Sequence, residues 1–191
     1  MKALKEAILR DGVGIGNDIV KVDSFLNHRI DVALSTQMGQ AFYEAFKDER
    51  VDCILTVEAS GIAVAVATAI ALNNIPVVFA KKSPSRNATD DAYQSRVYSY
   101  THSVDNYIRV AKPYLPAGSR VLIVDDFLAN GEACDGLCDL VRQAGATVAG
   151  IGVCVEKSFQ PGHGRLEQAG YKVYPLARVT GIRDGRLLVE D

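Results

Sequence analysis

The sequence lacks the features that mark several whole classes of protein. It contains no tryptophan, and no segment approaches the roughly 20 consecutive apolar residues that a helix needs to cross a bilayer. The formal net charge of -2 argues against a nucleic-acid-binding protein driven by overall positive charge. The N-terminal segment carries charges throughout and lacks the unbroken apolar core of a secretory signal. We therefore expect a cytoplasmic protein whose partners include neither a membrane nor a nucleic acid.

Cysteine is also scarce, with four residues in the chain. Cys134 and Cys138 stand four residues apart on a predicted helix, so they share one face. The pair has no histidine or further cysteine nearby, which makes it a poor zinc signature. Cys53 and Cys154 lie in apolar runs. We expect these cysteines to be buried as small hydrophobic side chains.

The sequence does contain short apolar runs that alternate with helical periods. Its 191 residues, 48% of them hydrophobic, suit one compact domain. Strands that alternate with helices and lack internal polar alternation predict an α/β fold with a mostly parallel sheet flanked by helices. The predicted strands are Cys53–Val57, Pro76–Ala80, Val121–Val124, Ala146–Val155 and Tyr171–Leu176. The predicted helices are Asp31–Asp48, Ile62–Leu72, Glu132–Ala144 and His163–Ala169.

Three stretches depart from this alternation. Lys81–Gln94 is polar and without periodicity, and a loop of that length inside a compact domain is usually functional or disordered. Gly12–Asn27 is glycine-rich at its start and lies outside the alternating core. Asp184-Gly185, between two apolar segments, predicts a hairpin turn.

The loops that follow the strands carry the polar residues. Ligands of an open parallel sheet bind beyond the carboxyl ends of its strands, so the topology brings these loops to one edge. Together they supply two adjacent carboxylates, several cations and two turns of small residues that lead into helices. The loops are Glu58–Gly61, Lys81–Lys82, Asp125–Gly131 and Glu156–Phe159.

The segment Asp125–Gly131 carries the most specific signal. Ala129, Asn130 and Gly131 are small and precede a helix, whose N-terminal N–H groups and partial positive charge suit a phosphate. The carboxylates of Asp125 and Asp126 accept hydrogen bonds from paired hydroxyls, and can hold Mg²⁺ directly or through water. An acidic turn that caps a helix is the plainer interpretation. The whole run fits the 5′-phosphate and the 2′,3′-hydroxyls of a ribose phosphate better.

The run Val121–Asp126 also resembles the opening of a response-regulator receiver. A receiver begins with that strand and places most of its chain after it, whereas only a short tail follows Asp126 here. No later predicted strand ends in a phospho-accepting aspartate. This alternative is therefore the weaker one.

At these residues the sequence resembles a known family. Val121–Ala133 resembles the diphosphate-sugar motif of the type I phosphoribosyltransferases. Val20–His28, Phe127–Gly131 and Glu156–Gly162 are similar to stretches of the xanthine phosphoribosyltransferases, in the purine branch, and the likeness runs through nearly the whole chain. The resemblance implies a single phosphoribosyltransferase domain over residues 1–191. It also implies a small base-binding hood, from about residues 12–30 plus the C-terminal part, and a flexible lid loop.

The resemblance also implies a reaction. Xanthine N9 would attack C1′ of 5-phospho-α-D-ribose 1-diphosphate, releasing diphosphate and giving xanthosine 5′-monophosphate in purine salvage. Such enzymes use Mg²⁺, held mainly by the substrate, and are usually homodimers. Two alternatives stay open. One is a guanine or hypoxanthine specificity, and the other is a non-catalytic regulator that senses the sugar diphosphate.

The implied catalytic residues are Asp125 and Asp126, which would meet the ribose hydroxyls and stabilise positive charge at the sugar carbon. The polar stretch after Lys82 would be a lid that excludes water. The residues expected to bind the phosphoribosyl diphosphate form a 5′-phosphate loop, a diphosphate loop and a lysine pair: Ala129, Asn130, Gly131, Glu132, Ala133, Glu58, Ala59, Ser60, Gly61, Lys81 and Lys82.

Four further residues are implied to bind the base. The cation of Lys157 would favour the oxygen and ring nitrogen on one edge of an oxopurine, and Phe159 would stack on the ring, with core packing an equal interpretation. Val20 and Asn27 would line the other side. Asn27 has donor and acceptor atoms for the 2-oxo edge. Without the resemblance, Asn27 would be interpreted as a helix or turn cap.

Ala129 is a departure that matters for mechanism. Hypoxanthine-guanine enzymes carry an aspartate at this position, and that aspartate is usually given the role of general base. Xanthine is more acidic than other common oxopurines. An ionised substrate would therefore lessen the need for a base.

Overall fold

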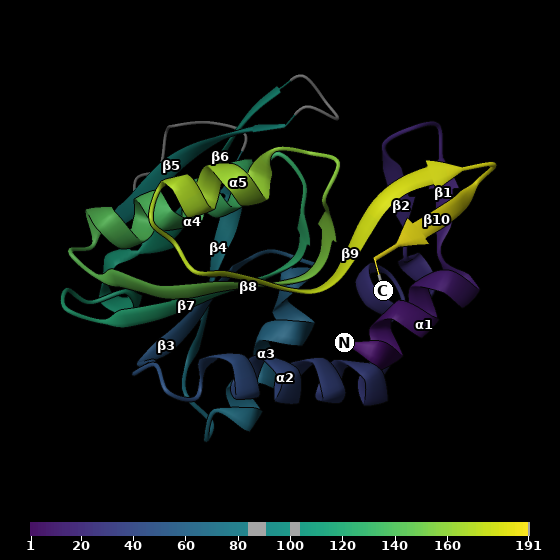
Figure 1. The fold of residues 1–191 in the computed structure, drawn as a ribbon. Coiled ribbons are helices and arrows are strands. Elements are labelled where there is room, and N and C mark those ends of the chain that lie inside the picture. Colours follow the sequence, from purple (N-terminus) through teal and green to yellow (C-terminus); the bar gives the residue numbers. More distant parts are fainter. Residues whose placement is uncertain (84–90, 100–103, 191) are drawn as a thin grey trace.

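The structure is a computed structural model that describes residues 1–83, 91–99 and 104–190. An eight-stranded sheet forms its centre (Figure 1). The strands, in spatial order, are β10 (Arg186–Val189), β9 (Val173–Arg183), β8 (Thr147–Lys157), β7 (Arg120–Leu128), β3 (Cys53–Val57), β4 (Val77–Ser83), β6 (Val104–Ala111) and β5 (Ala92–Ser99). The five strands from β9 to β4 run parallel, and β10, β6 and β5 pair antiparallel. The prediction of a mostly parallel sheet is confirmed.

Helices cover both faces of this sheet. α2 (Val32–Phe46) and α3 (Gly61–Ala71) lie on one face, while α4 (Glu132–Gln143) and α5 (Gly162–Gln168) lie on the other (Figure 1). Each face has its own hydrophobic cluster. Ile54 belongs to the cluster that contains Phe42 of α2, whereas the next residue, Leu55, belongs to the cluster that contains Leu137 of α4. Successive strand residues point to opposite faces, so a strand covered on both sides is apolar throughout.

The prediction of a polar loop over residues 81–94 is wrong at both ends, because strands occupy them. β4 continues to Ser83, and β5 begins at Ala92 and forms an antiparallel hairpin with β6. The sequence prediction missed β5 and β6 because their residues are largely polar. The central residues of the proposed lid, 84–90, lie outside the described residues.

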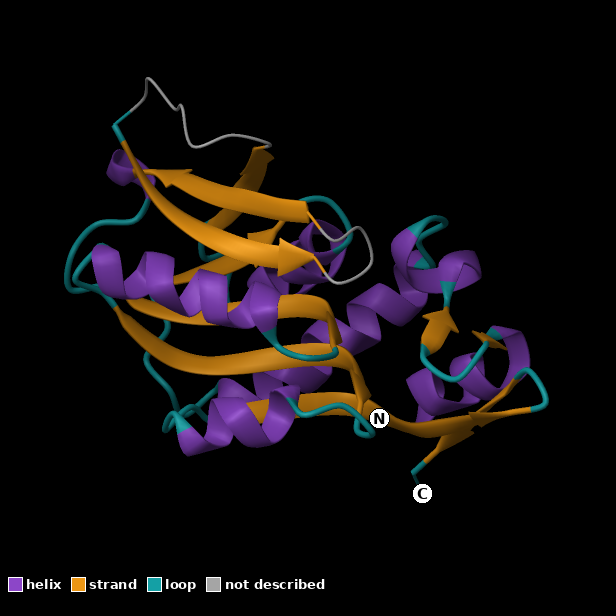
Figure 2. Ribbon diagram, turned by 90° about the horizontal axis from the view of Figure 1, so that it is seen from above, coloured by secondary structure: helices purple, strands orange, loops and turns teal. Residues whose placement is uncertain are grey.

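A smaller group of elements gathers at one end of the sheet. It contains α1 (Lys2–Asp11), β1 (Val13–Ile15), β2 (Ile19–Lys21), a π-helical turn at Asp23–Asn27, and β10. Figure 2 shows this group beside the main sheet, on the side where both termini lie, and its helix α1 contacts α2. β9 runs from the main sheet into it and turns into β10 through Asp184 and Gly185, which have positive φ angles of 51° and 74°. The predicted hairpin turn is confirmed, and the assignment of this group as a hood stays a prediction.

Gly14 allows the β1–β2 hairpin to lie directly on β9. A Cβ at Gly14 would lie 2.3 Å from Cγ2 of Ile182, closer than two carbon atoms can approach. Gly14, in the glycine-rich start of Gly12–Asn27, is therefore needed for close packing between the hairpin and β9.

Among the described residues, no helix is both long enough and apolar enough to cross a membrane.

Candidate active site

The predicted site segments meet at one edge of the sheet. β3, β4, β7 and β8 are consecutive parallel neighbours in the order β8-β7-β3-β4, so their carboxyl ends point the same way. α3 begins directly after the loop that follows β3, and α4 begins directly after the loop that follows β7. The N-termini of α3 and α4 therefore lie at the carboxyl ends of the two central strands, β3 and β7.

The acidic pair lies inside strand β7 rather than in the loop after it, which corrects the sequence-based placement. The ladder between β7 and β8 continues past Asp125, as far as Leu128 and Glu156. Asp125 is 3% exposed and Asp126 is 8% exposed. The Asp126 N–H donates to Oδ1 of Asp125 over 3.0 Å. Burial and the neighbouring Asp126 charge raise the pKa of Asp125 well above its ordinary value, and the Lys82 cation opposes that rise.

The start of α3 lies against this acidic pair. A Cβ on Gly61 would lie 2.1 Å from Oγ1 of Thr56 and 2.9 Å from Oδ1 of Asp125. Only glycine fits there without displacing one of these groups. The Thr56 side chain is buried, and its hydroxyl has no hydrogen-bond partner within the described part of the chain. Thr56 is thus a polar group at the site that the sequence reasoning missed.

The segment Ala129–Gly131 connects β7 to α4. Gly131 has a φ of 97°, in the left-handed region that glycine adopts at little cost, and it precedes the first helical residue, Glu132. No described side chain caps this helix. The N–H groups of the first turn, including those of Glu132 and Ala133, are therefore available to a ligand.

The carbonyl groups of this segment point toward α5. The N–H of Gly162 donates to the carbonyl of Ala129 over 3.1 Å, and the guanidinium of Arg165 donates to the carbonyl of Asn130 over 2.7 Å. In a trans peptide the C=O and the following N–H point in opposite directions. The N–H groups of Asn130 and Gly131 therefore point away from α5.

Gly162 and Arg165 are the supports that the sequence reasoning did not assign. A Cβ on Gly162 would lie 2.3 Å from the Ala129 carbonyl oxygen, so the segment rests directly on bare backbone. Arg165 also contacts the carboxylate of Asp135 on α4, which ties α5 to the helix that the segment begins. The signal in the sequence was the Pro161-Gly162 pair at the start of a short helix.

The loop after β3 carries Glu58, Ala59 and Ser60. The peptide bond between Glu58 and Ala59 is cis. Oε1 of Glu58 accepts a hydrogen bond of 2.6 Å from the N–H of Lys82, which joins this loop to β4. Among the described residues no side chain caps α3, so a second helix N-terminus with open N–H groups faces the same edge.

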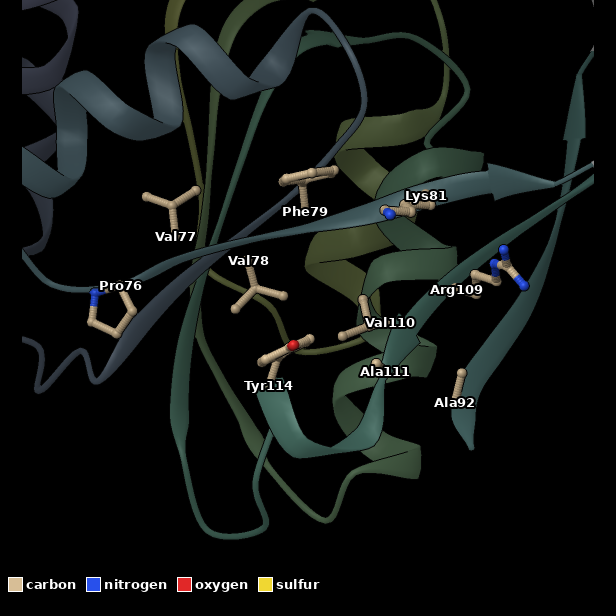
Figure 3. Close-up of a pocket in the computed structure, with 10 residues that line it drawn as sticks. All are labelled: Pro76, Val77, Val78, Phe79, Lys81, Ala92, Arg109, Val110, Ala111 and Tyr114. Atoms are coloured by element: carbon tan, nitrogen blue, oxygen red, sulfur yellow. The ribbon is translucent and has the colours of Figure 1, made fainter. Parts of the chain in front are cut away.

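Lys81 and Lys82 differ in where their side chains lie. Successive residues of a strand point to opposite faces, and the Lys82 cation acts on the carboxyl group of Asp125. Lys81 instead lines a cavity of about 480 Å³ between β4 and β6. Figure 3 shows Lys81 and Arg109 toward one end of this cavity, with Phe79 and Tyr114 along its wall. The structure thus brings Lys82, but not Lys81, to the acidic pair of its own chain.

Lys157 is the last residue of β8, which agrees with its predicted place at a strand end. Its Nζ donates to the carbonyl of Asp18, in the turn between β1 and β2, over 2.8 Å. The cation lies 5.9 Å from the centre of the Phe127 ring. Burial lowers the pKa of Lys157 from its ordinary value, and the Asp18 charge acts in the opposite direction. Lys157 therefore links the β1–β2 turn to the end of the sheet.

Asn27 lies at the end of the π-helical turn and is exposed. It lines a pocket of about 350 Å³ whose wall also includes Ala59 and Ser60 of the loop after β3. Two segments that are remote in sequence thus share one pocket. Val20 is only 7% exposed, and Phe159 is 38% exposed, which excludes core packing as the role of that ring.

Comparison with known proteins identifies the family of this chain. A family model described as the phosphoribosyl transferase domain matches residues 22–174. The chain is 51% identical to the xanthine phosphoribosyltransferase of Clostridioides difficile, with 97% of each chain covered, and 46% identical to that of Finegoldia magna over the full length of both. The chain belongs to the phosphoribosyltransferase family. The resemblance to its xanthine branch, read from Val20–His28 and Glu156–Gly162, is confirmed.

Solved structures show the same fold. The adenine phosphoribosyltransferase of Rhodothermus marinus aligns with a TM-score of 0.72 at 20% identity, covering 93% of this chain and 99% of the other. The type I phosphoribosyltransferase fold, predicted from the resemblance, is confirmed at the level of the architecture. At this identity the likeness shows the fold alone.

The cysteines of this phosphoribosyltransferase are not part of the site. Cys53, Cys134, Cys138 and Cys154 are buried and form no disulfide. Burial raises the pKa of Cys138 to about 12 and that of Cys53 to about 11, so both stay protonated thiols at neutral pH. The prediction that they act as small hydrophobic side chains is confirmed.

The donor set of the phosphoribosyltransferase site can be tested against the magnesium ion that the resemblance implies. Among the described residues, no three histidine, cysteine, aspartate or glutamate side chains gather to enclose a metal. Asp125 and Asp126 supply two carboxylates beside open N–H groups. Mg²⁺ is commonly held by one or two carboxylates together with substrate phosphates, so these residues fit it.

Proposed function

We propose that this chain catalyses transfer of the phosphoribosyl group of 5-phospho-α-D-ribose 1-diphosphate to N9 of xanthine. The C1′–O bond to diphosphate breaks, and diphosphate leaves with the electron pair. The bond between N9 and C1′ forms, and xanthosine 5′-monophosphate is the product. The relatives named xanthine phosphoribosyltransferase support the choice of base.

One observation carries the proposal. The open N-termini of α3 and α4 flank a buried acidic pair, and the strands that precede them, β3 and β7, are adjacent and parallel. Two phosphate groups and the sugar between them need that arrangement, with an anion site on either side of a hydroxyl-binding centre. A molecule that carries phosphate at both ends of a ribose fits it.

The phosphate groups would occupy the two helix starts. The N–H groups of Asn130, Gly131, Glu132 and Ala133 would bind the 5′-phosphate, with Ala129 as the support held by α5. The Glu58–Gly61 loop and Lys82 would bind the diphosphate. Lys81, which was also predicted to bind diphosphate, faces another cavity, and its role stays a prediction.

The acidic pair would act on the sugar. Asp125 and Asp126 would accept hydrogen bonds from the ribose hydroxyls and stabilise the positive charge that develops at C1′ as diphosphate departs. Asp125 or Asp126 would hold a Mg²⁺ ion that the substrate also binds, and that ion would supply charge neutralisation for the leaving diphosphate.

The base would lie between the end of β8 and the hood. Lys157 would donate to an oxygen of the oxopurine, Phe159 would stack on the ring, and Asn27 with Val20 would bind the opposite edge. Ala129 provides no carboxylate to accept the N9 proton. We propose that xanthine reacts as its anion, which needs no protein base. A pH–rate profile that does not follow the ionisation of xanthine would contradict this.

We also propose that the protein is a homodimer. α3 and β4 are in contact and expose apolar side chains that a monomer leaves in water. Val66 is 44% exposed and Ile70 is 63% exposed on α3, and Phe79 is 39% exposed on β4. Sedimentation of wild-type protein and of Ile70→Glu measures this. The expected result is a dimer that the variant weakens, and a wild-type monomer at micromolar concentration would contradict it.

The test of the proposed function is a steady-state panel with xanthine, guanine, hypoxanthine and adenine, run with and without Mg²⁺. We expect xanthine to have the highest kcat/KM and adenine to give no detectable product. Activity should fall strongly without Mg²⁺. Guanine in first place would reassign the base, and no diphosphate release with any purine would favour a regulator that only binds the sugar diphosphate. The cytoplasmic location stays a prediction.

A further inference from the structure

A cluster of ionisable side chains lies behind Ala129–Gly131, the segment that we propose binds the 5′-phosphate (the 5′-phosphate segment). Glu156, at the end of β8, is 4% exposed. Its Oε2 lies 2.9 Å from Nδ1 of His163 on α5 and 3.1 Å from Nε of Arg178 on β9. A carboxylate so deeply buried is costly unless it is paired and hydrogen-bonded, and Glu156 has both partners.

His163 lies between two carboxylates. Its side chain is 16% exposed, and Nε2 lies 3.2 Å from Oε1 of Glu167, one helical turn further along α5. Each ring nitrogen therefore faces a carboxylate, Nδ1 that of Glu156 from the sheet and Nε2 that of Glu167 from its own helix. Arg178 and its second partner, Glu190, complete the set of charged groups around Glu156.

We propose that the hydrogen bond between Glu156 and His163 acts as a clamp that positions the 5′-phosphate segment. Glu156 and His163 are then positioning residues for the reaction. The proposal rests on the function assigned above, because it takes Ala129–Gly131 as the binding site for the 5′-phosphate.

The mechanical link is short. His163 directly follows Gly162, whose N–H holds the Ala129 carbonyl, and Arg165 two residues later holds the Asn130 carbonyl. These two hydrogen bonds fix the direction of the peptide groups whose N–H atoms face the phosphate. The position of α5 therefore sets the direction of those N–H groups.

The clamp fixes α5 against the strands that carry the site. Glu156 is the ladder partner of Leu128, the last residue of β7 before the segment. This buried contact thus sets the spacing between the end of β7 and the helix behind the phosphate.

The variants separate this role from simple stability. Glu156→Gln keeps the shape of the side chain and removes its carboxylate, and His163→Gln removes the imidazole. His163→Arg keeps N–H donors that can reach the Glu156 carboxylate. Glu167→Gln is the matched control, because Glu167 contacts the same imidazole from an exposed position (59% of its side chain) and does not connect α5 to the sheet.

The measurement is the KM for each substrate together with kcat. We expect His163→Gln and Glu156→Gln to raise the KM for 5-phospho-α-D-ribose 1-diphosphate about 10- to 100-fold, because a displacement near 1 Å has effects of that size. The KM for xanthine should change less than about two-fold. His163→Arg should recover most of the loss, and Glu167→Gln should behave as wild type. Circular dichroism at the assay temperature checks that each variant is folded.

Two results would overturn the clamp. One is an unchanged KM for the sugar diphosphate in both Glu156→Gln and His163→Gln, and the other is an equal rise for both substrates. If His163→Gln does not fold, the isosteric Glu156→Gln variant decides. A wild-type protein that turns over no purine would overturn the proposed function instead. The two failures are therefore distinguishable, because only the second affects the wild type.

Discussion

The two sides of the site are built in different ways. The phosphate side is one continuous segment, Ala129–Ala133, between a strand and a helix, and α5 holds it from behind. The base side has no such continuous segment. Its predicted residues come from β2, from a π-helical turn and from the end of β8, and Lys157 bridges two of these pieces through the Asp18 carbonyl.

This difference predicts how substitutions on each side of the site affect the use of each substrate. The phosphate side depends on backbone direction, so it is sensitive to any group that displaces the chain. The base side, as proposed, would depend on individual side chains that each contact one edge or one face of the base. We expect substitutions on the first side to impair the use of the sugar diphosphate with any purine, and those on the second to change the choice of purine.

The largest effect is expected for Gly162→Ala. The added methyl would lie 2.3 Å from the Ala129 carbonyl oxygen, so the segment must shift. We expect the KM for the sugar diphosphate to rise about 100-fold. Gly164→Ala is the control, because nothing lies within 4 Å of a Cβ there. A wild-type KM in Gly162→Ala would show that the contact does not position the phosphate.

On the base side, Lys157→Ala should raise the KM for xanthine about 10- to 100-fold, the range expected for a lost charged hydrogen bond. The KM for the sugar diphosphate should stay nearly constant. Lys172→Ala is a matched control, since Lys172 also donates to a backbone carbonyl, that of Ala45, and lies over the Phe46 ring, away from the site. Equal losses for both substrates would remove Lys157 from base recognition.

Lys81 and Lys82 of β4 should differ in their effect on the use of the sugar diphosphate, and this effect is smaller than the two above. Lys82→Ala should raise the KM for the sugar diphosphate about ten-fold, as a lost charged contact does. Lys81→Ala should have the lesser effect, because Lys81 faces the cavity beside β6. Initial rates over a range of sugar diphosphate concentrations measure both. Equal effects would mean that Lys81 reaches a substrate outside the site of its own chain.

The smallest effect concerns stability. Because burial raises the pKa of Asp125, its stabilising effect is present below its ordinary pKa of 3.8 and is lost as pH rises through the raised value. Asp125→Asn should therefore increase the free energy of unfolding at pH 7, by about 1 kcal/mol, while activity falls. Urea denaturation measures this, and a decrease in stability would contradict the assignment.

Asp52→Asn should change the free energy of unfolding at pH 7 in the direction opposite to Asp125→Asn. Asp52 accepts a hydrogen bond from the N–H of Arg120, which lowers the pKa of that carboxyl. Its contribution is present above its ordinary pKa and is lost as pH falls through the lowered value. Neutralising it should therefore lower stability at pH 7.

The sequence predicted the strand-to-helix arrangement of Val121–Ala133 well and the contacts behind it poorly. An apolar strand, two aspartates, small residues and a helix stand next to one another in the chain, so local rules placed them. Strand β7 still ran further than predicted, because pairing with β8 continues past Asp125. Pairing of that kind is a tertiary effect that local patterns do not report.

The clamp residues Glu156 and His163 illustrate what the sequence alone does not show. They are seven positions apart, and nothing in their spacing indicates that a short helix turns back to place them 2.9 Å apart. Asn27 is a similar case, because its pocket is shared with Ala59 and Ser60 only after the chain has folded. The resemblance to a family supplied Asn27 as a candidate, and the residue pattern by itself did not.

The most direct test of the account is a competition assay. Purified protein with Mg²⁺ and the sugar diphosphate receives equal concentrations of xanthine, guanine, hypoxanthine and adenine, and mass spectrometry identifies the nucleoside monophosphates formed at early times. The ratio of products then equals the ratio of kcat/KM values. The account predicts that xanthosine 5′-monophosphate predominates and that adenosine 5′-monophosphate is undetectable. A different predominant product, or no nucleotide at all, would contradict it.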